Sequence, residues 1–397
     1  MAIAIVAGAI ANKPLNGGES WVRLSWILGL RRLGFDVYFA EVLGAAACVD
    51  AAGRPAAFAD SVNRAHLEGV VGEFALRDRT SLLDERGERL YGLDAAQLGE
   101  VISEAEVLFD VSGHLGAMSP AARARRRVYV DLDPGFTQAW HADPSLAFAL
   151  SGYDRYVTVG LNVGSAGCPV PVAGVQWIAT LPPIVLDEWT GGRPGRETDE
   201  QADRDANRFT TVATWRTPYG PIEIGGRSLG LKHHEFRRLI ELPGLVDGAQ
   251  FELALDIDRA DAEDLRALQT HGWSVVSPRR VAGTPDDFRD YVRRSFAEFS
   301  VAQPAYVQTR SGWFSDRTAA YLAAGRPALV QDTGVGRTLE LGEGLLTFST
   351  PREAAERARR IVADPVAHAQ AARSLAERHL DSDRVLARLL QALGIGG

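Results

Sequence analysis

The stretch from Gln308 to Leu346 constrains the fold of this 397-residue chain more than any other. A turn-prone run at 310–312 precedes a helical pattern that begins near Ser315, whose side chain can cap the first amides of a helix. Pro327 bars continuation of that helix, and residues 328–331 then form a short apolar strand before a second glycine turn. The pattern predicts a loop–helix–strand–turn unit of an α/β sheet.

The start of this helix has the chemistry of an anion site. A glycine beside a helix N-terminus lets backbone amides and the positive end of the dipole approach an anion. Arg310 and Arg317 flank that point and can add bidentate contacts to phosphate oxygens. The plainer alternative is an ordinary structural unit with two surface arginines. The residues that we expect to bind phosphate here are Arg310, Ser311, Gly312, Ser315, Asp316, Arg317 and Gly334.

This stretch resembles the nucleotide-sugar half of glycosyltransferases with the GT-B fold, of the family 4 and family 1 kind. Many of these carry a glycine-containing loop, a helix ending in E-A-hydrophobic-A-x-G-x-P, a strand and a glycine turn. Here the helix ends in Tyr321-Leu-Ala-Ala-Gly325-Arg-Pro327, and residues 340–346 are similar to the acidic, glycine-bearing segment that follows. Ala320 departs from the pattern, because the family has there an acidic residue that contacts the donor's ribose or sugar. The resemblance implies an α/β fold of two facing Rossmann-like domains with a cleft between them.

Length and composition agree with that expectation. A chain of 397 residues is long for one core, so two domains are expected. The net charge of −8 argues against a nucleic-acid partner. Cys48 and Cys168 are too isolated for a disulfide framework, which predicts a cytoplasmic location, and no stretch is long and apolar enough for a membrane helix. Abundant arginine with only two lysines suggests a GC-rich genome and a bacterial enzyme of secondary metabolism.

The chain opens with a βαβ unit. Residues 3–7 are a continuous apolar run of parallel-strand type, followed by a glycine-bearing loop, a helix and a strand at 37–40. The loop is not GxGxxG, so dinucleotide binding is a weak alternative. Gly17 and Gly18 resemble the N-terminal GT-B loop that faces the cleft, so we expect them on the acceptor side. Glu41 is expected to be a surface or loop residue.

A polar, charge-dense segment rich in glycine and proline divides the chain near residues 188–207. We place the linker at 191–207. The predicted domains are then 1–190, acceptor-binding and Rossmann-like, and 208–380, nucleotide-sugar-binding and Rossmann-like. The resemblance implies that the last segment, 381–397, is a helix that crosses back to the first domain.

Acid–base candidates follow two successive strands. The strand at 107–111 runs into His114, and the strand at 128–132 runs into Asp133. Open α/β sheets bind ligands at the carboxyl ends of their strands, where a histidine or carboxylate can take a proton from a hydroxyl. The alternatives are a loop histidine and an Asp-Pro-Gly turn. Trp140 either lines the acceptor pocket or belongs to the core.

Two further cations lie early in the second half. The strand at 209–214 runs into Arg216, and the corresponding loop of GT-B enzymes approaches the donor phosphates. Lys232 follows a glycine-rich run without Walker spacing, so it is either a phosphate contact or a solvated lysine. Residues 277–280 lie where the nucleotide base rests in the family. Residues 80–93 are charged and turn-rich.

These observations predict a glycosyltransferase that moves a sugar from a nucleoside diphosphate sugar to a hydroxyl of a small acceptor. The donor would be a UDP-, dTDP- or GDP-sugar, and no other cofactor is expected. GT-B enzymes generally need no metal, and the DxD-like spacing of Asp131 and Asp133 falls in the acceptor half. A nucleotide-sugar epimerase and a non-catalytic nucleotide-sugar-binding protein remain alternatives, and a homodimer stays open.

Overall fold

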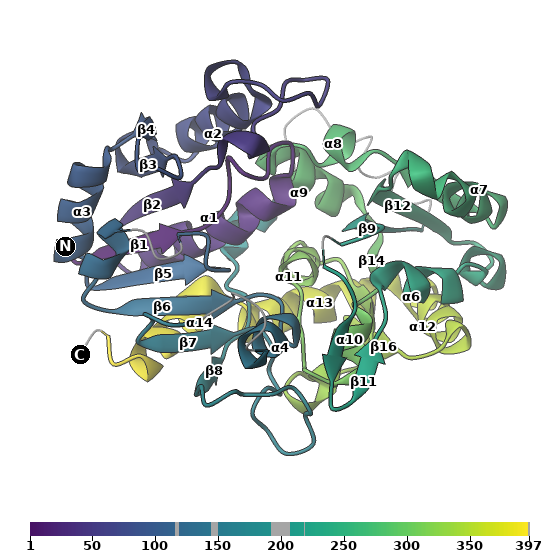
Figure 1. The fold of residues 1–397 in the computed structure, drawn as a ribbon. Helices are drawn as coiled ribbons and strands as arrows, with labels where there is room; N and C mark the ends of the chain where they lie inside the picture. Colours follow the sequence, from purple (N-terminus) through teal and green to yellow (C-terminus); the bar gives the residue numbers. More distant parts are fainter. Residues whose placement is uncertain (116–118, 144–149, 192–206, 218, 396–397) are drawn as a thin grey trace.

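The structure is a computed structural model that describes residues 1–115, 119–143, 150–191, 207–217 and 219–395. We call residues 1–191 the N-terminal part and residues 207–395 the C-terminal part. Each part contains one open sheet, and the two sheets lie side by side (Figure 1). The predicted linker at 191–207 lies almost wholly outside the described residues. Two parallel sheets with helices confirm the predicted α/β class.

The N-terminal sheet has eight strands in the order β4-β3-β2-β1-β5-β6-β7-β8, and only β4 runs antiparallel to its neighbour. Its strands are β1 (Ile3–Ala7), β2 (Asp36–Val42), β3 (Thr80–Leu83), β4 (Arg89–Gly92), β5 (Val107–Val111), β6 (Arg127–Asp131), β7 (Arg155–Thr158) and β8 (Trp177–Ala179). The helices of this part include α1 (Gly17–Arg32), α2 (Val62–Glu73), α3 (Ala95–Glu104) and α4 (Phe136–Ala142).

The C-terminal sheet has six parallel strands in the order β13-β12-β9-β14-β15-β16. They are β9 (Arg208–Thr214), β12 (Gln250–Asp256), β13 (Trp273–Val276), β14 (Ala297–Ser300), β15 (Ala328–Gln331) and β16 (Leu345–Phe348), and β10 (Ile222–Ile224) with β11 (Arg227–Leu229) forms a separate hairpin. The helices include α6 (Lys232–Arg238), α7 (Ala262–Thr270), α8 (Pro278–Val281), α9 (Pro285–Arg294), α10 (Pro304–Gln308), α11 (Asp316–Ala323), α12 (Pro351–Ala363), α13 (Pro365–His379) and α14 (Ser382–Ala392).

The apolar run of β1 is continuous because both faces of its sheet are covered. Side chains alternate along a strand, so Ala4 and Val6 pack with α1 and α2 on one face. Ile5 and Ala7 pack with α3 on the other face. This is the pattern expected of a central parallel strand, and the predicted strand is confirmed.

The two parts share one apolar core. The cluster on α1 continues into α9, α11, α13 and α14, and so reaches one face of the C-terminal sheet. Trp21 of α1 donates from Nε1 to the carbonyl oxygen of Pro285 at 2.8 Å. A Cβ at Gly29 would lie 2.6 Å from Leu386, so α1 and α14 approach closely. Helix α14 therefore packs on the N-terminal part through α1 (Figure 1).

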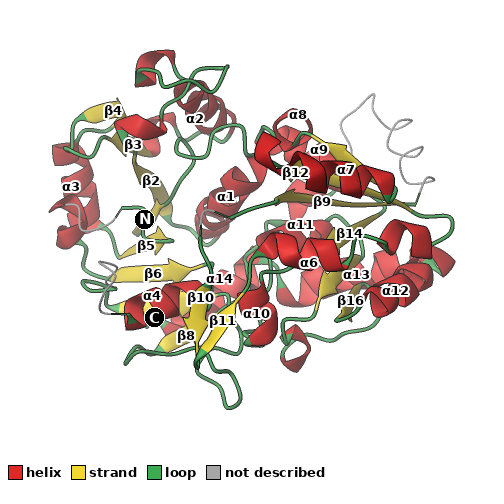
Figure 2. Ribbon diagram, turned by 45° about the vertical axis from the view of Figure 1, so that its right-hand side comes forward, coloured by secondary structure: helices red, strands yellow, loops and turns green. Residues whose placement is uncertain are grey.

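A second contact between the parts is aromatic. The β10–β11 hairpin and α10 of the C-terminal part lie against α4 (Figure 2). Phe136 of α4 packs on Tyr219 and Tyr306, with ring centroids 5.3 and 6.0 Å apart. This aromatic cluster lies beside the carboxyl end of β6, where the candidate base Asp133 is found.

The segment at 80–93 differs from the prediction, since it contains the strands β3 and β4. β3 is only four residues long, although all four are buried, and β4 is an edge strand with exposed ends. Neither strand therefore has the long apolar or alternating pattern that sequence inspection detects. No helix among the described residues is long and apolar enough to cross a membrane.

Candidate functional site

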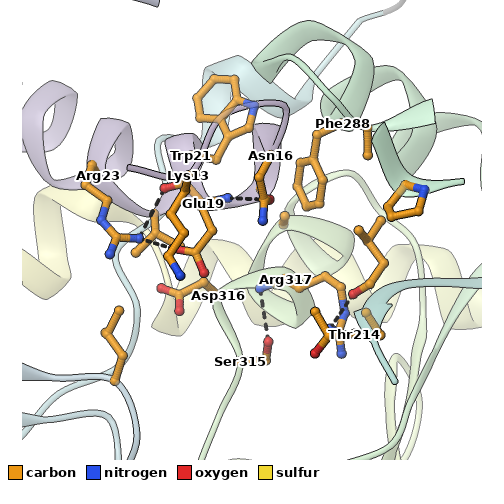
Figure 3. Close-up of a pocket in the computed structure, with 18 of the residues that line it drawn as sticks. Lys13, Asn16, Glu19, Trp21, Arg23, Thr214, Phe288, Ser315, Asp316 and Arg317 are labelled. Atoms are coloured by element: carbon orange, nitrogen blue, oxygen red, sulfur yellow. Dashed lines mark hydrogen bonds and ion pairs between the residues drawn. The ribbon is translucent and has the colours of Figure 1, made fainter. Parts of the chain in front are cut away.

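A cleft of about 440 Å³ lies between the two parts. The carboxyl ends of β6 and β9 face it, together with the loop after β1 and the start of α11. Figure 3 shows Lys13, Glu19, Arg23 and Asp316 gathered on one side and Arg317 beside Thr214 on the other. Ligands of open α/β sheets bind at such strand ends.

Glu41 holds the loop after β1 in place. It lies within β2 and is 2% exposed, which corrects the expectation of a surface or loop residue. Its carboxylate accepts hydrogen bonds from the amides of residues 10, 11 and 12 at 3.0, 2.8 and 2.7 Å. Burial raises the pKa of Glu41 to about 7, although these amides and the charge of Arg23 oppose the rise. The loop therefore reaches the cleft in a fixed conformation.

The helix α1 presents an ion pair to the cleft. Glu19 and Arg23 lie one turn apart and pair directly. Arg23 is 2% exposed, and its Nε has no hydrogen-bond partner among the described residues. Burial would raise the pKa of Glu19, but the charges of Arg23 and Lys13 outweigh it and hold the pKa below its usual range. Arg23 thus supplies positive charge to the wall of the cleft.

Both predicted acid–base residues line the cleft. Burial raises the pKa of Asp133 to about 6, although the hydroxyl of Tyr306 donates to its Oδ1 at 2.7 Å and opposes the rise. Burial and the charge of Arg23 lower the pKa of His114 to about 4. Near neutral pH the carboxylate of Asp133 is the stronger base of the two, because its conjugate acid is the weaker acid.

Asp131 lies two residues before Asp133 but is fully buried. Its carboxylate accepts hydrogen bonds from the side chains of Thr137, Gln138 and Thr158 at 2.7, 2.8 and 2.6 Å, and from the amide of Asp133 at 2.9 Å. These donors belong to the turn after β6, to the first residues of α4 and to neighbouring β7. Asp131 therefore fixes the turn that carries Asp133 toward the cleft.

Two cations of the C-terminal part line the same cleft. Arg317 is anchored by Glu298 at 2.7 Å, by the Ser300 hydroxyl at 2.6 Å and by a carbonyl oxygen of β9 at 2.9 Å. The Lys232 ammonium has no carboxylate within 4.0 Å among the described residues. Burial and the charge of Arg317 lower the pKa of Lys232 to about 7. This side of the cleft therefore suits an anion.

The start of α11 lies between the two sets of charges. Ser315 caps the helix, since its Oγ accepts from the amide of Arg317 at 3.2 Å. Asp316 also lines the cleft, and burial raises its pKa to about 6. Ala320 lies one turn further along and is 2% exposed at the cleft wall.

Arg216 and Arg310 lie outside the residues that line the cleft. Arg216 makes a bidentate pair with Asp261, at 2.8 Å from Nε and 2.6 Å from Nη2. Arg310 is half exposed and pairs with Asp332 at 3.3 Å. Both side chains already have a carboxylate partner in this conformation.

The glycine turns predicted to approach phosphate instead surround Asn162 of the N-terminal part. Its side-chain nitrogen donates to the carbonyl oxygens of Arg310 and Gly334 at 2.8 and 3.0 Å. Its backbone N–H donates to the carbonyl oxygen of Ser311 at 2.9 Å. Gly312 has φ +74°, and a Cβ there would lie 2.9 Å from Asn162. The structure therefore brings Ser311, Gly312 and Gly334 to a contact between the parts rather than to the cleft.

The predicted acceptor residues divide in the same way. Gly18 lines the cleft, and a Cβ there would lie 3.0 Å from the ring of Phe288. Gly17 donates to the carbonyl oxygen of Ala282 at 2.9 Å and leaves no room for a side chain beside Thr284. Trp140 packs on Tyr219 in the aromatic cluster, with centroids 4.8 Å apart. Of the three, only Gly18 is part of the cleft wall.

Sequence inspection did not identify Glu19, Arg23 or Tyr306. Arg23 stands in a mostly apolar run of α1, WVRLSWIL, and an arginine on the buried face of a helix was the available signal. Among the described residues, no group of three or more His, Cys, Asp or Glu side chains is placed to hold a metal ion.

Comparison with solved structures identifies similar folds at low sequence identity. The Anabaena protein Alr3699/HepE in complex with UDP-glucose has a TM-score of 0.60 and 13% identity, and the alignment covers 99% of each chain. AviGT4, a glycosyltransferase of avilamycin A biosynthesis, has a TM-score of 0.55 and 11% identity over 99% of this chain and 97% of that one. A putative UDP-N-acetylglucosamine 2-epimerase from Listeria monocytogenes has a TM-score of 0.51 and 12% identity, with 99% and 96% covered. No protein-family model and no curated protein matches the chain.

Proposed function

We propose that this chain, which has the GT-B glycosyltransferase fold, transfers a sugar from a nucleoside diphosphate sugar to a hydroxyl group of a small acceptor. The observation that carries the proposal is that Lys232 and Arg317 line the same cleft as Asp133. The cations can stabilise the negative charge that develops on the departing diphosphate. The carboxylate can take the proton that the acceptor hydroxyl loses.

The C-terminal part would bind the donor. Lys232 is the direct phosphate ligand, because its ammonium has no carboxylate partner among the described residues. Arg317 is held at a fixed place by Glu298 and adds positive charge, together with the amides at the start of α11. Pro278 and Arg279 also line the cleft and would contact the nucleotide base.

The N-terminal part would bind and activate the acceptor. Asp133 would act as the base, since burial brings its pKa to about 6, and His114, which lines the same cleft, would orient the acceptor hydroxyl. The acceptor oxygen bonds to the anomeric carbon while the bond from that carbon to the diphosphate oxygen breaks. The electron pair leaves with the diphosphate, and the acceptor's proton goes to Asp133.

The similarity of HepE in complex with UDP-glucose and of AviGT4 in avilamycin A biosynthesis supports a UDP-sugar donor and a small natural-product acceptor. An epimerase is the second candidate, favoured by the Listeria neighbour and by the carboxylates of Glu19, Asp133 and Asp316 in one cleft. Release of free nucleotide and a 2-epimeric sugar without any acceptor would distinguish it.

The first experiment is calorimetric binding of UDP, dTDP, GDP and NADH. We expect one nucleoside diphosphate to bind, and Lys232→Met to weaken it about tenfold, or about 1.4 kcal/mol. Lys232 is the better probe because Arg317 also supports the buried Glu298. Binding of NADH alone, or of none of the four, contradicts the proposal. Turnover of the matching sugar nucleotide then separates an enzyme from a non-catalytic binding protein.

A further inference from the structure

Asp133 of the N-terminal part is held by a residue of the C-terminal part. The hydroxyl of Tyr306, on α10, donates to Oδ1 of Asp133 at 2.7 Å across 173 positions of sequence. Tyr306 is 3% exposed, and burial together with the charge of Asp133 holds its pKa well above the usual range. Its hydroxyl therefore keeps its proton near neutral pH and can donate to the carboxylate.

The aromatic cluster fixes the direction of this hydroxyl. The ring of Tyr306 stacks on Trp313, with centroids 4.7 Å apart and planes at 28°, and meets Phe136 edge-on at 6.0 Å. Trp313 in turn donates from Nε1 to the carbonyl oxygen of Leu132 at 3.3 Å. Since Leu132 is next to Asp133 in sequence, both hydrogen bonds hold the end of β6 against the C-terminal part.

Asn162 also joins the two parts by hydrogen bonds, but it makes no hydrogen bond to Asp133. It joins the two glycine turns of the C-terminal part through bonds of 2.8 and 3.0 Å, and it is 3% exposed. Tyr306 and Asn162 thus both connect the parts, but only Tyr306 reaches a carboxylate that lines the cleft.

We propose that Tyr306 is a positioning residue for Asp133, so that the base is complete only when the two parts are docked. The inference rests on the proposed function, in which Asp133 takes the acceptor's proton. An O–H donor to a carboxylate stabilises the ionised form and holds its orientation. Oδ1 is occupied by Tyr306, which leaves Oδ2 for the incoming proton.

The test is Tyr306→Phe, which removes the hydroxyl and keeps the ring. The assay uses the nucleoside diphosphate glucose whose nucleotide binds most tightly. It measures the rate at which glucose is hydrolysed or transferred from this donor between pH 5 and pH 9. We expect the acid limb of kcat, near pH 6 in the unaltered protein, to move up by about one pH unit, with KM unchanged and activity recovered above pH 8. A purely structural loss would lower kcat by the same factor at every pH.

Asn162→Ala is the matched control. It also removes hydrogen bonds between the parts, so it tests loosened docking without a change at Asp133. We expect this variant to leave the acid limb at its original pH. The inference is overturned if Tyr306→Phe does not move the limb, or if Asn162→Ala moves it equally.

A second measurement does not need turnover. The pKa of folded Asp133, about 6, is raised above its ordinary value of 3.8, so its ionisation makes the folded state less stable as the pH rises between these values. In Tyr306→Phe this fall in the thermal midpoint should extend to about pH 7, and in an Asp133→Asn background Tyr306→Phe should cause no pH-dependent change. Suppose that the fall in the thermal midpoint extends to about pH 7 but no sugar nucleotide is turned over. That result refutes the proposed function and the role of Asp133 as base, but it still shows that the Tyr306 hydrogen bond sets the pKa of Asp133. Turnover without either shift refutes the role of Tyr306.

Discussion

The two walls of the cleft are built alike, but the group that has no charged partner is a cation in one wall and a carboxylate in the other. In the C-terminal wall, Arg317 is balanced by the buried Glu298, while Lys232 has no carboxylate partner among the described residues. In the N-terminal wall, Arg23 is balanced by Glu19, while the carboxylate of Asp133 accepts a hydrogen bond from the hydroxyl of Tyr306 and has no cationic partner in the part of the chain that the structure describes. Each wall thus contains one compensated ion pair, and beside it a titratable group of shifted pKa without a charged partner, Lys232 in one wall and Asp133 in the other. Asp316 and His114 also line the cleft with shifted pKa values.

The difference between the walls lies in the sign of the uncompensated group. Burial lowers the pKa of Lys232 to about 7 and raises that of Asp133 to about 6, because it penalises the charged form of each. A ligand that is anionic at one end and loses a proton at the other relieves both penalties. We therefore assign the two ion pairs a structural role, and the roles proposed in binding and proton transfer fall on Lys232 and Asp133.

The largest effect is expected from breaking the support of the cationic wall. Arg317→Met leaves the carboxylate of Glu298 buried without its cation, which should cost about 3–5 kcal/mol of unfolding free energy at pH 7. Urea unfolding measures this loss. The double variant Arg317→Met/Glu298→Gln removes the stranded charge and should recover part of it. A loss below about 1 kcal/mol would show that the pair is not structural.

The next effect separates two carboxylates of the opposite wall. Asp131→Asn replaces one carboxylate oxygen, so two of the four donors lose their acceptor, and the change should cost about 2–3 kcal/mol. Asp133→Asn should leave stability at pH 7 unchanged or raise it by about 1 kcal/mol, because the raised pKa shows that the ionised form is disfavoured on folding. Thermal unfolding at pH 7 measures the stability of both variants. Equal losses of stability would contradict the different roles given to Asp131 and Asp133.

A smaller effect is expected from titrating Lys232. With its pKa lowered to about 7, this side chain loses its charge as the pH rises from 7 to 9, a range in which a terminal phosphate, with its pKa near 6, is already ionised. Affinity for the nucleoside diphosphate should fall about tenfold over that range, or about 1.4 kcal/mol. The same calorimetric titration of Lys232→Met should give a nearly flat profile. A parallel fall in the variant would assign the titration to another group.

The smallest effect concerns the helix that lies between the walls. Ser315→Ala removes the cap of α11 and should cost about 1 kcal/mol of unfolding free energy. Ser315→Thr keeps an oxygen at the cap and should cost less. Urea unfolding of the two variants gives the difference, and equal losses would indicate that the side-chain oxygen does not stabilise the helix.

Several strands could be predicted because central parallel strands have continuous apolar runs, as at residues 3–7 and 107–111. Lys232 and Arg317 were expected near phosphate, and the structure places both on one cleft. The glycines at 312 and 334 have the same local signal whether they meet an anion or Asn162. Which partner they meet depends on residues about 150 positions away, as does the contact of Tyr306 with Asp133.

Buried charge is the other feature that local patterns miss. Glu41 follows an apolar strand pattern and resembles a residue at its exposed end, yet its carboxylate is buried against three amides of another loop. Arg23 differs, because its partner Glu19 lies four residues earlier on the same helix, a spacing that the sequence itself displays. For Glu41, only the assembled fold shows that the buried charge is compensated.

The close packing of α14 on α1 has a consequence for the order in which the chain can fold during synthesis. Leu386, Leu389 and Leu390 complete the apolar core that begins with β1, so the first strand and the last helix belong to one cooperative unit. Residues 1–191 leave the ribosome early but keep part of α1 uncovered until residue 390 has emerged. The part of α1 that α14 covers therefore stays exposed to solvent until translation is nearly finished.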